Sequence, residues 1–132
     1  MKRAYLAISY SNRRFFNNEV ESLKQLFKKH HMELLVFVDQ YNFKPNQEKD
    51  MMETAFKEID TCDVLIAELT TKSIGVGIEI GYAHAKKKPV IYLYKKNAEY
   101  STTAAGSSTH VIAYENELDL NQSMENYLSQ FN

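Results

Sequence analysis

The chain has 132 residues, which is the usual size of one domain and too short for two separate cores. A hydrophobic fraction of 44%, with 9 Tyr, 7 Phe and only 2 Pro, is typical of a folded globular protein and excludes a disordered or fibrous chain. Because 16 basic residues face 17 acidic ones, the net charge of -1 excludes a strongly basic surface for nucleic acid or an anionic membrane.

The sequence of the first half of the chain predicts two strand–helix units. Residues 4–8 are apolar and predict a strand, and residues 18–30 carry apolar side chains at the spacing of a helix. Residues 33–38 form a second short apolar run, which predicts another strand. Residues 39–46 predict a loop of the kind that carries function, and residues 47–61 predict a second helix.

The second half continues the same alternation. Residues 63–68 predict the clearest strand, because a continuous apolar run is what a parallel strand covered on both faces requires. A third helix is predicted over residues 75–87. After this helix, the sequence predicts a strand at residues 90–94 and then a loop rich in Ser, Thr and Ala at residues 95–109. A strand at residues 110–114 and an amphipathic helix at residues 118–131 follow.

This order of elements indicates the fold class. Strands and helices alternate with short connections, and right-handed crossovers return each strand to a parallel sheet. We therefore predict one α/β domain over residues 1–132, a doubly wound three-layer sandwich with a five-stranded parallel sheet, flavodoxin/Rossmann-like. Ligands of such folds bind beyond the carboxyl ends of the strands, where the loops starting at Ser9, Asp39, Leu69 and Lys95 lie.

Cys62 is the only cysteine, which excludes an internal disulfide and a cysteine-based zinc site. Its place before a buried strand favours a small core residue over a nucleophile. No cluster of His, Cys and Asp has the spacing of metal ligands, so we expect no metal and no cofactor. The apolar runs are strand-sized and no signal-peptide pattern is present, so we expect a cytoplasmic protein that does not enter a membrane.

Residues 73–81 leave the third predicted strand and open a helix, yet they contain three of the four glycines. A glycine inside a helix costs up to about 1 kcal/mol relative to alanine. Either a ligand approaches the backbone closely at Gly75 and Gly77, or the helix packs tightly on the sheet. The free amides of the first helical turn, together with the Ser73 hydroxyl, form an anion site of the kind that binds a phosphate.

Glu79 is unusual, because it lies between Ile78 and Ile80 in a helix whose surroundings look buried. The phosphate-type turn directly upstream favours a functional role for this carboxylate. The segment is not the dinucleotide-binding fingerprint, since it follows the third strand and has Ile80 where a third glycine would fall. A plain dehydrogenase is therefore disfavoured.

Two stretches carry a family resemblance. Residues 63–68, Asp-Val-Leu-Ile-Ala-Glu, and residues 73–83, Ser-Ile-Gly-Val-Gly-Ile-Glu-Ile-Gly-Tyr-Ala, resemble the nucleoside 2-deoxyribosyltransferase superfamily. The branch they resemble most is that of the 2'-deoxynucleoside 5'-monophosphate N-glycosidases. The resemblance implies that Glu79 is the nucleophile and that Ser73 contacts the 5'-phosphate. Free-nucleoside transferases more often carry an acid at the position of Ser73, which would repel a phosphate.

The resemblance extends more weakly over the whole chain. It implies that Tyr5 orients the nucleophile and that Ser9 belongs to the phosphate loop. It also implies that Ser101, in the late loop at residues 100–106, reaches the phosphate of the neighbouring subunit in a homodimer. The expected partners are thus a small nucleotide or nucleoside and a second copy of the chain, with no nucleic acid and no membrane.

Two residues depart from the family pattern. The family aspartate that contacts the sugar and assists the leaving base falls, by ungapped count, on Ala55. Either another acid supplies that proton or the protein is slow or inactive. Asp39 is our first candidate because it ends the second predicted strand at the crevice edge, and the other candidates are Asp50 and Glu58.

The arginine of the family's phosphate loop falls on Ser11, and Arg13 and Arg14 are near enough to replace it. A second, shorter resemblance also involves this region. Residues 7–11, Ala-Ile-Ser-Tyr-Ser, followed by a helix, resemble the opening of Toll/interleukin-receptor-like domains, some of which cleave the glycosidic bond of NAD with a helix glutamate.

We predict hydrolysis of the N-glycosidic bond of a (2'-deoxy)nucleoside 5'-monophosphate through a covalent glycosyl-Glu79 intermediate. Three alternatives stay open: deoxyribosyl transfer between free bases, cleavage of NAD, and a nucleotide-binding module with impaired catalysis. The residues do not indicate the base, nor do they distinguish deoxyribose from ribose.

Overall fold

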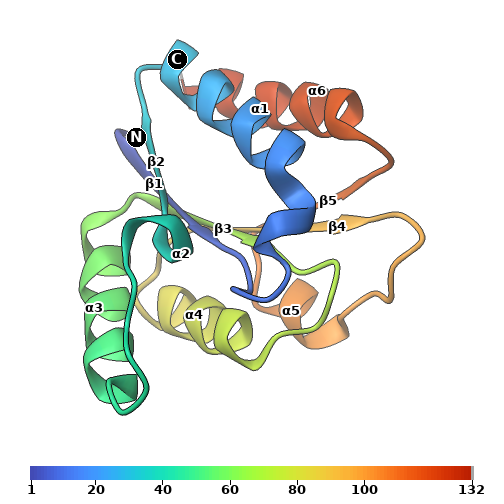
Figure 1. Cartoon of the computed structure of the whole chain (residues 1–132). Helices are drawn as coiled ribbons and strands as arrows, with labels where there is room; N and C mark the ends of the chain where they lie inside the picture. The colour runs from blue at the N-terminus through green and yellow to red at the C-terminus, as the bar shows by residue number, and fades with distance from the viewer. Residues whose placement is uncertain (132) are drawn as a thin grey trace.

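The computed structural model describes residues 1–131 and has three layers, with one sheet between two layers of helices (Figure 1). All five strands are parallel, in the order β2-β1-β3-β4-β5. The strands are β1 (Arg3–Ala7), β2 (Glu33–Val36), β3 (Val64–Glu68), β4 (Val90–Lys95) and β5 (His110–Tyr114). The order reverses between β1 and β3, so the predicted doubly wound fold and its five-stranded parallel sheet are confirmed.

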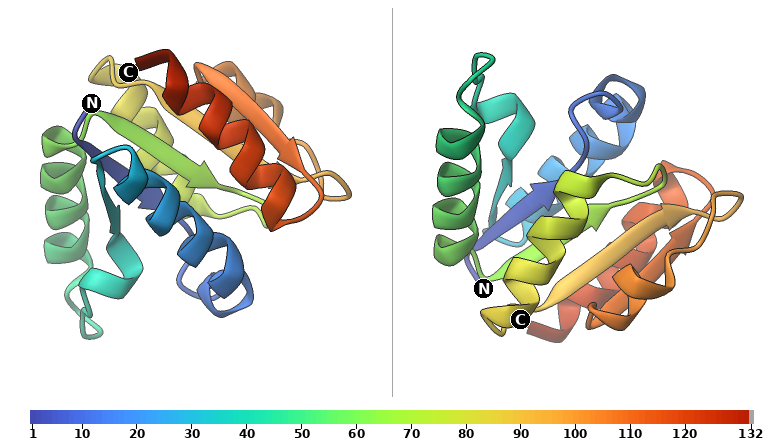
Figure 2. Two further views of the ribbon diagram at one scale, coloured as in Figure 1. Left: turned by 90° about the horizontal axis from the view of Figure 1, so that it is seen from above. Right: turned by 90° about the horizontal axis from the view of Figure 1, so that it is seen from below.

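The helices divide between the two faces of the sheet, as the two views in Figure 2 show. One face is covered by α1 (Asn17–Lys29) and α6 (Glu117–Leu128), and the other by α3 (Glu48–Thr61), α4 (Ile74–Ala85) and the short α5 (Thr102–Gly106). A single turn, α2 (Phe37–Gln40), follows β2. Two 3-10 turns, Arg13–Phe16 and Ser129–Phe131, precede α1 and follow α6. No helix within residues 1–131 is long and apolar enough to span a membrane.

Each strand contributes alternate side chains to two separate cores. On β3, Val64 and Ile66 pack with α1 and α6, whereas Leu65 and Ala67 pack with α3 and α4. Every residue of β3 is buried, as expected of a central parallel strand covered on both faces. Cys62, which precedes β3, is buried in the second core, so the prediction of a small core residue is confirmed.

Two loop predictions are wrong in part. The predicted second strand ends at Val36, and Phe37–Gln40 forms α2, which places Asp39 in a helical turn. The predicted loop at residues 95–109 contains α5, whose first turn is capped by Ser101. Both helices are only four or five residues long, too short to show a 3.6-residue period in the sequence.

Candidate active site

A cavity of about 610 Å³ opens at the carboxyl ends of β1 and β3. This is the point where the strand order reverses, the place where ligands bind in doubly wound sheets. Its walls come from the turn after β1 (residues 7–12), from α2 and α3, and from the segment that connects β3 to α4. Segments far apart in the sequence therefore enclose one site.

Glu79 and Tyr5 meet at the base of this site. Tyr5 is fully buried on β1, and its hydroxyl donates a hydrogen bond to Oε2 of Glu79 on α4. Burial raises the pKa of Glu79 to about 7, and the Tyr5 hydrogen bond opposes that rise by stabilising the carboxylate. Burial and the adjacent Glu79 charge raise the pKa of Tyr5 far above its usual value, so the phenol stays a donor.

Ser73 begins α4 at the rim of the same cavity. Its backbone is extended, and its Oγ accepts a hydrogen bond from the Val76 amide at 3.3 Å, which makes it the N-cap. Amides in the first turn of a helix have no acceptor within the helix, and they carry the positive end of its dipole. The rim of the cavity can therefore bind an anion beside the Ser73 hydroxyl.

The glycines of α4 are not explained by tight packing on the sheet. A Cβ added at Gly75 would come no closer than 3.9 Å to Ser73 Oγ, and one added at Gly77 or Gly81 would meet no atom within 4 Å. This contradicts the tight-packing interpretation at these positions. Gly75 lines the cavity that holds Glu79, so the bare backbone there leaves the start of the helix open to a ligand.

Ser9 lines the same cavity from the turn after β1. Its Oγ accepts hydrogen bonds from the amide and the side-chain nitrogen of Asn12, at 3.2 and 3.0 Å, and lies 3.1 Å from Ser11 Oγ. These contacts hold the turn in shape. An apolar part of the cavity wall is formed by Ile8, Phe37, Val38, Met51, Met52 and Ala55.

The Phe37 ring stacks on Tyr5, with ring centroids 5.7 Å apart. An apolar wall that includes an aromatic ring suits a flat, weakly polar group such as a nucleobase. The polar rim and the apolar wall together suit a ligand with an anionic end and a flat apolar end.

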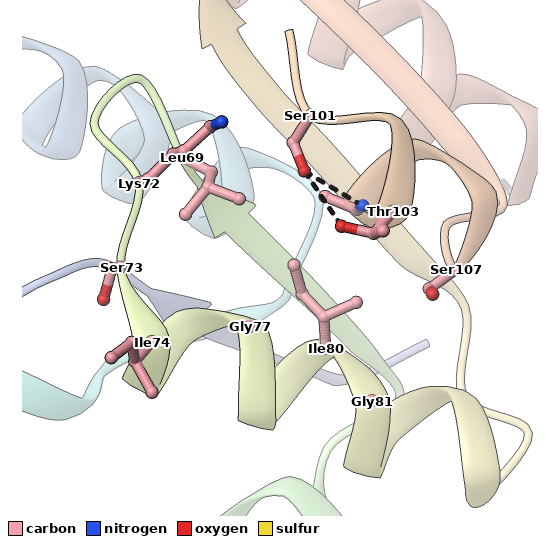
Figure 3. Close-up of a pocket in the computed structure, with 11 residues that line it drawn as sticks. Leu69, Lys72, Ser73, Ile74, Gly77, Ile80, Gly81, Ser101, Thr103 and Ser107 are labelled. Atoms are coloured by element: carbon pink, nitrogen blue, oxygen red, sulfur yellow. Dashed lines mark hydrogen bonds between the residues drawn. The ribbon is translucent and has the colours of Figure 1, made fainter. Parts of the chain in front are cut away.

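A second cavity, of about 400 Å³, lies between α4 and α5 (Figure 3). It contains Gly77 and Ser101, and it shares Lys72 and Ser73 with the first cavity. Ser101 Oγ accepts from the Ala104 amide at 3.2 Å and thus caps α5. Within one chain, Ser101 and Gly77 are therefore separate from the cavity that holds Glu79.

Comparison with known proteins identifies the family. The model of the family described as nucleoside 2-deoxyribosyltransferase matches residues 4–127. The chain belongs to the nucleoside 2-deoxyribosyltransferase family. This confirms the resemblance drawn from the Ser73 and Glu79 region of the sequence.

Two curated relatives, from Syntrophotalea carbinolica and Methanosarcina barkeri, carry the name "Putative 2'-deoxynucleoside 5'-phosphate N-hydrolase 1". The first is 46% identical over 46 residues, or 35% of this chain and 32% of the relative. The second is 42% identical over 50 residues, or 38% of this chain and 31% of the relative. The matched stretch thus spans about a third of the length of these curated relatives.

Two solved structures share the fold. The CMP N-glycosidase of Clostridium botulinum matches with a TM-score of 0.72 and 25% identity, over 96% of this chain and 99% of that one. A 2-deoxyribosyltransferase of Bacillus psychrosaccharolyticus matches with a TM-score of 0.74 and 14% identity, over 95% and 91% of the two chains. The latter identity is low enough that the match shows the fold alone.

The family resemblance implies a role for several residues, and the structure brings most of them together. The cavity that holds Glu79 is lined by Ser9, Ser73 and Gly75. The Tyr5 hydroxyl donates a hydrogen bond to Glu79. Ala55 is buried and lines the same cavity, so the position assigned to the family aspartate does face the site. Among residues 1–131, Glu79 is the one carboxylate in the lining.

Asp39 does not line the cavity that holds Glu79. It lies in α2 beside a neighbouring cavity, where Arg13 donates to both of its carboxylate oxygens at 2.9 Å. With both oxygens bonded to a guanidinium, the carboxyl is poorly placed to donate to a leaving base, which argues against the predicted role as general acid. The other two candidates, Glu58 and Asp50, do not line the cavity that holds Glu79. Glu58 bonds Arg3 and Tyr41, and Asp50 is exposed on α3.

Sequence reasoning missed Lys72, which lines both cavities. The available signal was its position directly before Ser73 in the loop after the third strand. It also missed the part of the apolar wall that Met51 and Met52 form, because the sequence pattern indicates only that both belong to a helix. Within the part of the chain that the structure describes, no group of three or more His, Cys, Asp or Glu side chains is arranged to hold a metal ion.

Proposed function

We propose that this protein hydrolyses the N-glycosidic bond of a nucleoside 5'-monophosphate. The observation that carries the proposal is the pairing of Glu79 with Tyr5 in the same cavity as the Ser73-capped start of α4. One end of that cavity offers a nucleophile, and the other offers an anion site. The names of the relatives, a 2'-deoxynucleoside 5'-phosphate N-hydrolase and a CMP N-glycosidase, support the same substrate class.

In the proposed mechanism, the Glu79 carboxylate attacks C1' of the sugar while the bond to the base breaks. The base leaves with the bonding electrons and takes a proton from solvent. Water then attacks C1' of the glycosyl ester and loses a proton to solvent, which returns the Glu79 carboxylate and gives the sugar 5-phosphate with net retention. The Tyr5 phenol holds the carboxylate in position for both steps.

The dimensions of α4 support a phosphate at its N-terminus. Each residue advances an α-helix by about 1.5 Å, so Glu79 lies roughly 9 Å along the axis from Ser73. A sugar ring can lie between these two points, with its phosphate at Ser73 and Ser9 and its C1' at Glu79. Binding energy from the phosphate would then orient the carbon that reacts.

We further propose that the active form is a homodimer in which Ser101 of one copy reaches the phosphate site of the other. The surface of α4 supports this proposal. Ile74 and Ile78 are 86% and 48% exposed, and the sides of Gly77 and Gly81 are open. An apolar helix face that stays uncovered is typical of an interaction surface.

A panel of substrates tests the reaction. Ribo- and deoxyribonucleoside 5'-monophosphates, the matching nucleosides and NAD would each be incubated with the protein, and base release would be followed by chromatography. We expect release from monophosphates and little from nucleosides. Release from nucleosides with exchange of a second base would instead indicate a transferase, and release from NAD alone would indicate NAD cleavage. Binding without release would indicate an impaired nucleotide-binding module.

A further inference from the structure

Among residues 1–131, no arginine lines the proposed phosphate site. Ser11 stands where the family resemblance predicts the phosphate-loop arginine. Arg13 is bonded to Asp39 and Asn17, and Arg14 lies over the Phe15 ring, with 4.7 Å to the ring centroid. Neither arginine lines the cavity that holds Glu79. A phosphate carries close to two negative charges at neutral pH, so a cation in the wall would strengthen its binding considerably.

Lys72 is the one cationic side chain in the lining of that cavity, among the residues that the structure describes. It directly precedes Ser73, the N-cap of α4. Its Nζ donates to Oε1 of Glu99 at 2.8 Å. Figure 3 shows the Lys72 ammonium directed away from the Ser73 hydroxyl.

The bond between Lys72 and Glu99 is easily broken. The two side chains are 61% and 75% exposed, and an ion pair so exposed contributes about 0.2 to 1 kcal/mol. A hydrogen bond between an ammonium and a phosphate within a cavity is stronger than this. The flexible four-carbon stem of a lysine allows the ammonium to move from one acceptor to the other.

We propose that Lys72 is the residue that recognises the 5'-phosphate by charge, and that Glu99 holds it away from the site until the phosphate binds. The identity of the ligand rests on the function proposed above. When the phosphate binds at Ser73, the Lys72 ammonium leaves Glu99 and pairs with a phosphate oxygen. Glu99 therefore weakens phosphate binding, because its bond to Lys72 must break first.

Sugar phosphates test this proposal without knowledge of the base. Binding of 2-deoxyribose 5-phosphate and ribose 5-phosphate would be measured by NMR titration, with deoxyribose and ribose as the probes that lack phosphate. We expect Lys72→Met to weaken binding of both sugar phosphates about tenfold and to leave the plain sugars unchanged. Lys72→Arg should retain binding within about threefold, because it keeps the charge.

Glu99→Gln should change affinity in the opposite direction. Removing the resting partner of Lys72 should strengthen sugar-phosphate binding by about two- to fivefold, and this gain should vanish in the double variant with Lys72→Met. Lys96 and Glu115 provide the matched control, since they form a similar exposed pair at 3.5 Å outside both cavities. Lys96→Met and Glu115→Gln should leave binding unchanged.

The proposal is overturned if Lys72→Met binds the sugar phosphates as tightly as the parent, or if Lys96→Met weakens binding equally. It also fails if the parent does not distinguish a sugar phosphate from the plain sugar. Failure of the proposed hydrolysis has a different signature. In that case the Lys72 and Glu99 effects on binding would appear as expected, while no nucleotide in the panel would release its base.

Discussion

Two opposing influences act on the Glu79 carboxylate. Burial disfavours its charge and the Tyr5 hydroxyl favours it, with the result that the pKa lies at about 7. A carboxylate must be ionised to act as a nucleophile, whereas an ionised carboxylate at this buried position lowers the stability of the folded state. Activity and stability should therefore respond to pH in opposite directions at this single residue.

Glu79→Gln should lower base release by about a hundredfold or more, because it removes the proposed nucleophile and nearly keeps the shape of the side chain. It should also raise stability at alkaline pH. Between the unfolded pKa of 4.5 and the folded pKa of about 7, the folded parent retains a proton that the unfolded chain has lost, so the parent loses stability as pH rises.

The size of that loss is about 3 kcal/mol. Thermal unfolding at pH 5 and pH 8 measures it, and the melting temperatures of parent and variant should differ more at pH 8. Base release within tenfold of the parent would contradict the assignment of Glu79 as nucleophile.

Tyr5→Phe should shift the pH profile. The lost hydrogen bond was lowering the pKa of Glu79, so that pKa should rise above 7 and the rise of activity with pH should move to more alkaline values. The rate of base release between pH 5 and pH 9 measures the shift. Tyr41→Phe is the control, because Tyr41 donates to Glu58 outside the cavity. An unchanged profile for Tyr5→Phe would show that Tyr5 does not tune the carboxylate.

At the scale of the elements, α4 carries both ends of the proposed chemistry. Ser73 caps its first turn and Glu79 lies less than two turns later, so a single rigid helix sets the separation of the anion site and the nucleophile. The helix α3 carries Ala55, which faces the same cavity from the side. Substitutions at Ser73 should therefore affect the choice of substrate, and substitutions at Ala55 should affect turnover.

Ser73→Asp should move preference away from phosphates. Aspartate is as good an N-cap as serine, so α4 should keep its first turn, but its charge repels a phosphate. We expect KM for monophosphates to rise at least about tenfold, with little change for nucleosides. Asn116→Asp is the matched control, since Asn116 caps α6 far from the cavity. An equal loss for both substrate types would indicate damage to the helix instead.

Ala55→Asp should raise turnover if no other side chain in the site protonates the leaving base. General acid catalysis contributes roughly 10²- to 10⁴-fold, and Ala55 lines the cavity beside Glu79. Ala55 is only 1% exposed, so the variant should also melt at a lower temperature. The rate of base release tests this, with Asp39→Asn made in parallel. If Asp39→Asn lowers turnover tenfold and Ala55→Asp does not raise it, Asp39 supplies the proton despite its bond to Arg13.

At the scale of the whole molecule, the uncovered face of α4 continues into the second cavity, where Ser101 lies. Lys72 and Ser73 belong to both cavities, so a second copy docked on this face would lie close to the phosphate site. The proposed dimer would thereby complete a site that one chain only partly encloses.

Sedimentation of the protein should show a dimer, and Ile78→Glu should convert it to a monomer, because Ile78 is exposed and a buried unpaired charge is costly. The same variant should raise KM for monophosphates, since Ser101 of the second copy is lost. Glu21→Ile, on the opposite side of the sheet, is a control that should leave the dimer intact. A parent protein that sediments as a monomer would contradict the proposal.

Local sequence patterns determined the order of strands and helices and the placement of Ser73 and Glu79 on one helix. Buried parallel strands are continuous apolar runs, and an N-cap and a residue six positions later share a helix wherever it folds. The same patterns could not reveal α2 and α5, which are shorter than two helical turns.

Only the tertiary structure decided which side chains meet across the sheet edge. Asp39 is bonded to Arg13, 26 positions away, and Lys72 to Glu99, 27 positions away, and neither pair has a local pattern that predicts it. The open sides of Gly77 and Gly81 likewise depend on what packs around α4 rather than on the glycines themselves. Such contacts arise from the crossing of distant segments, and their geometry exists only once the chain has folded.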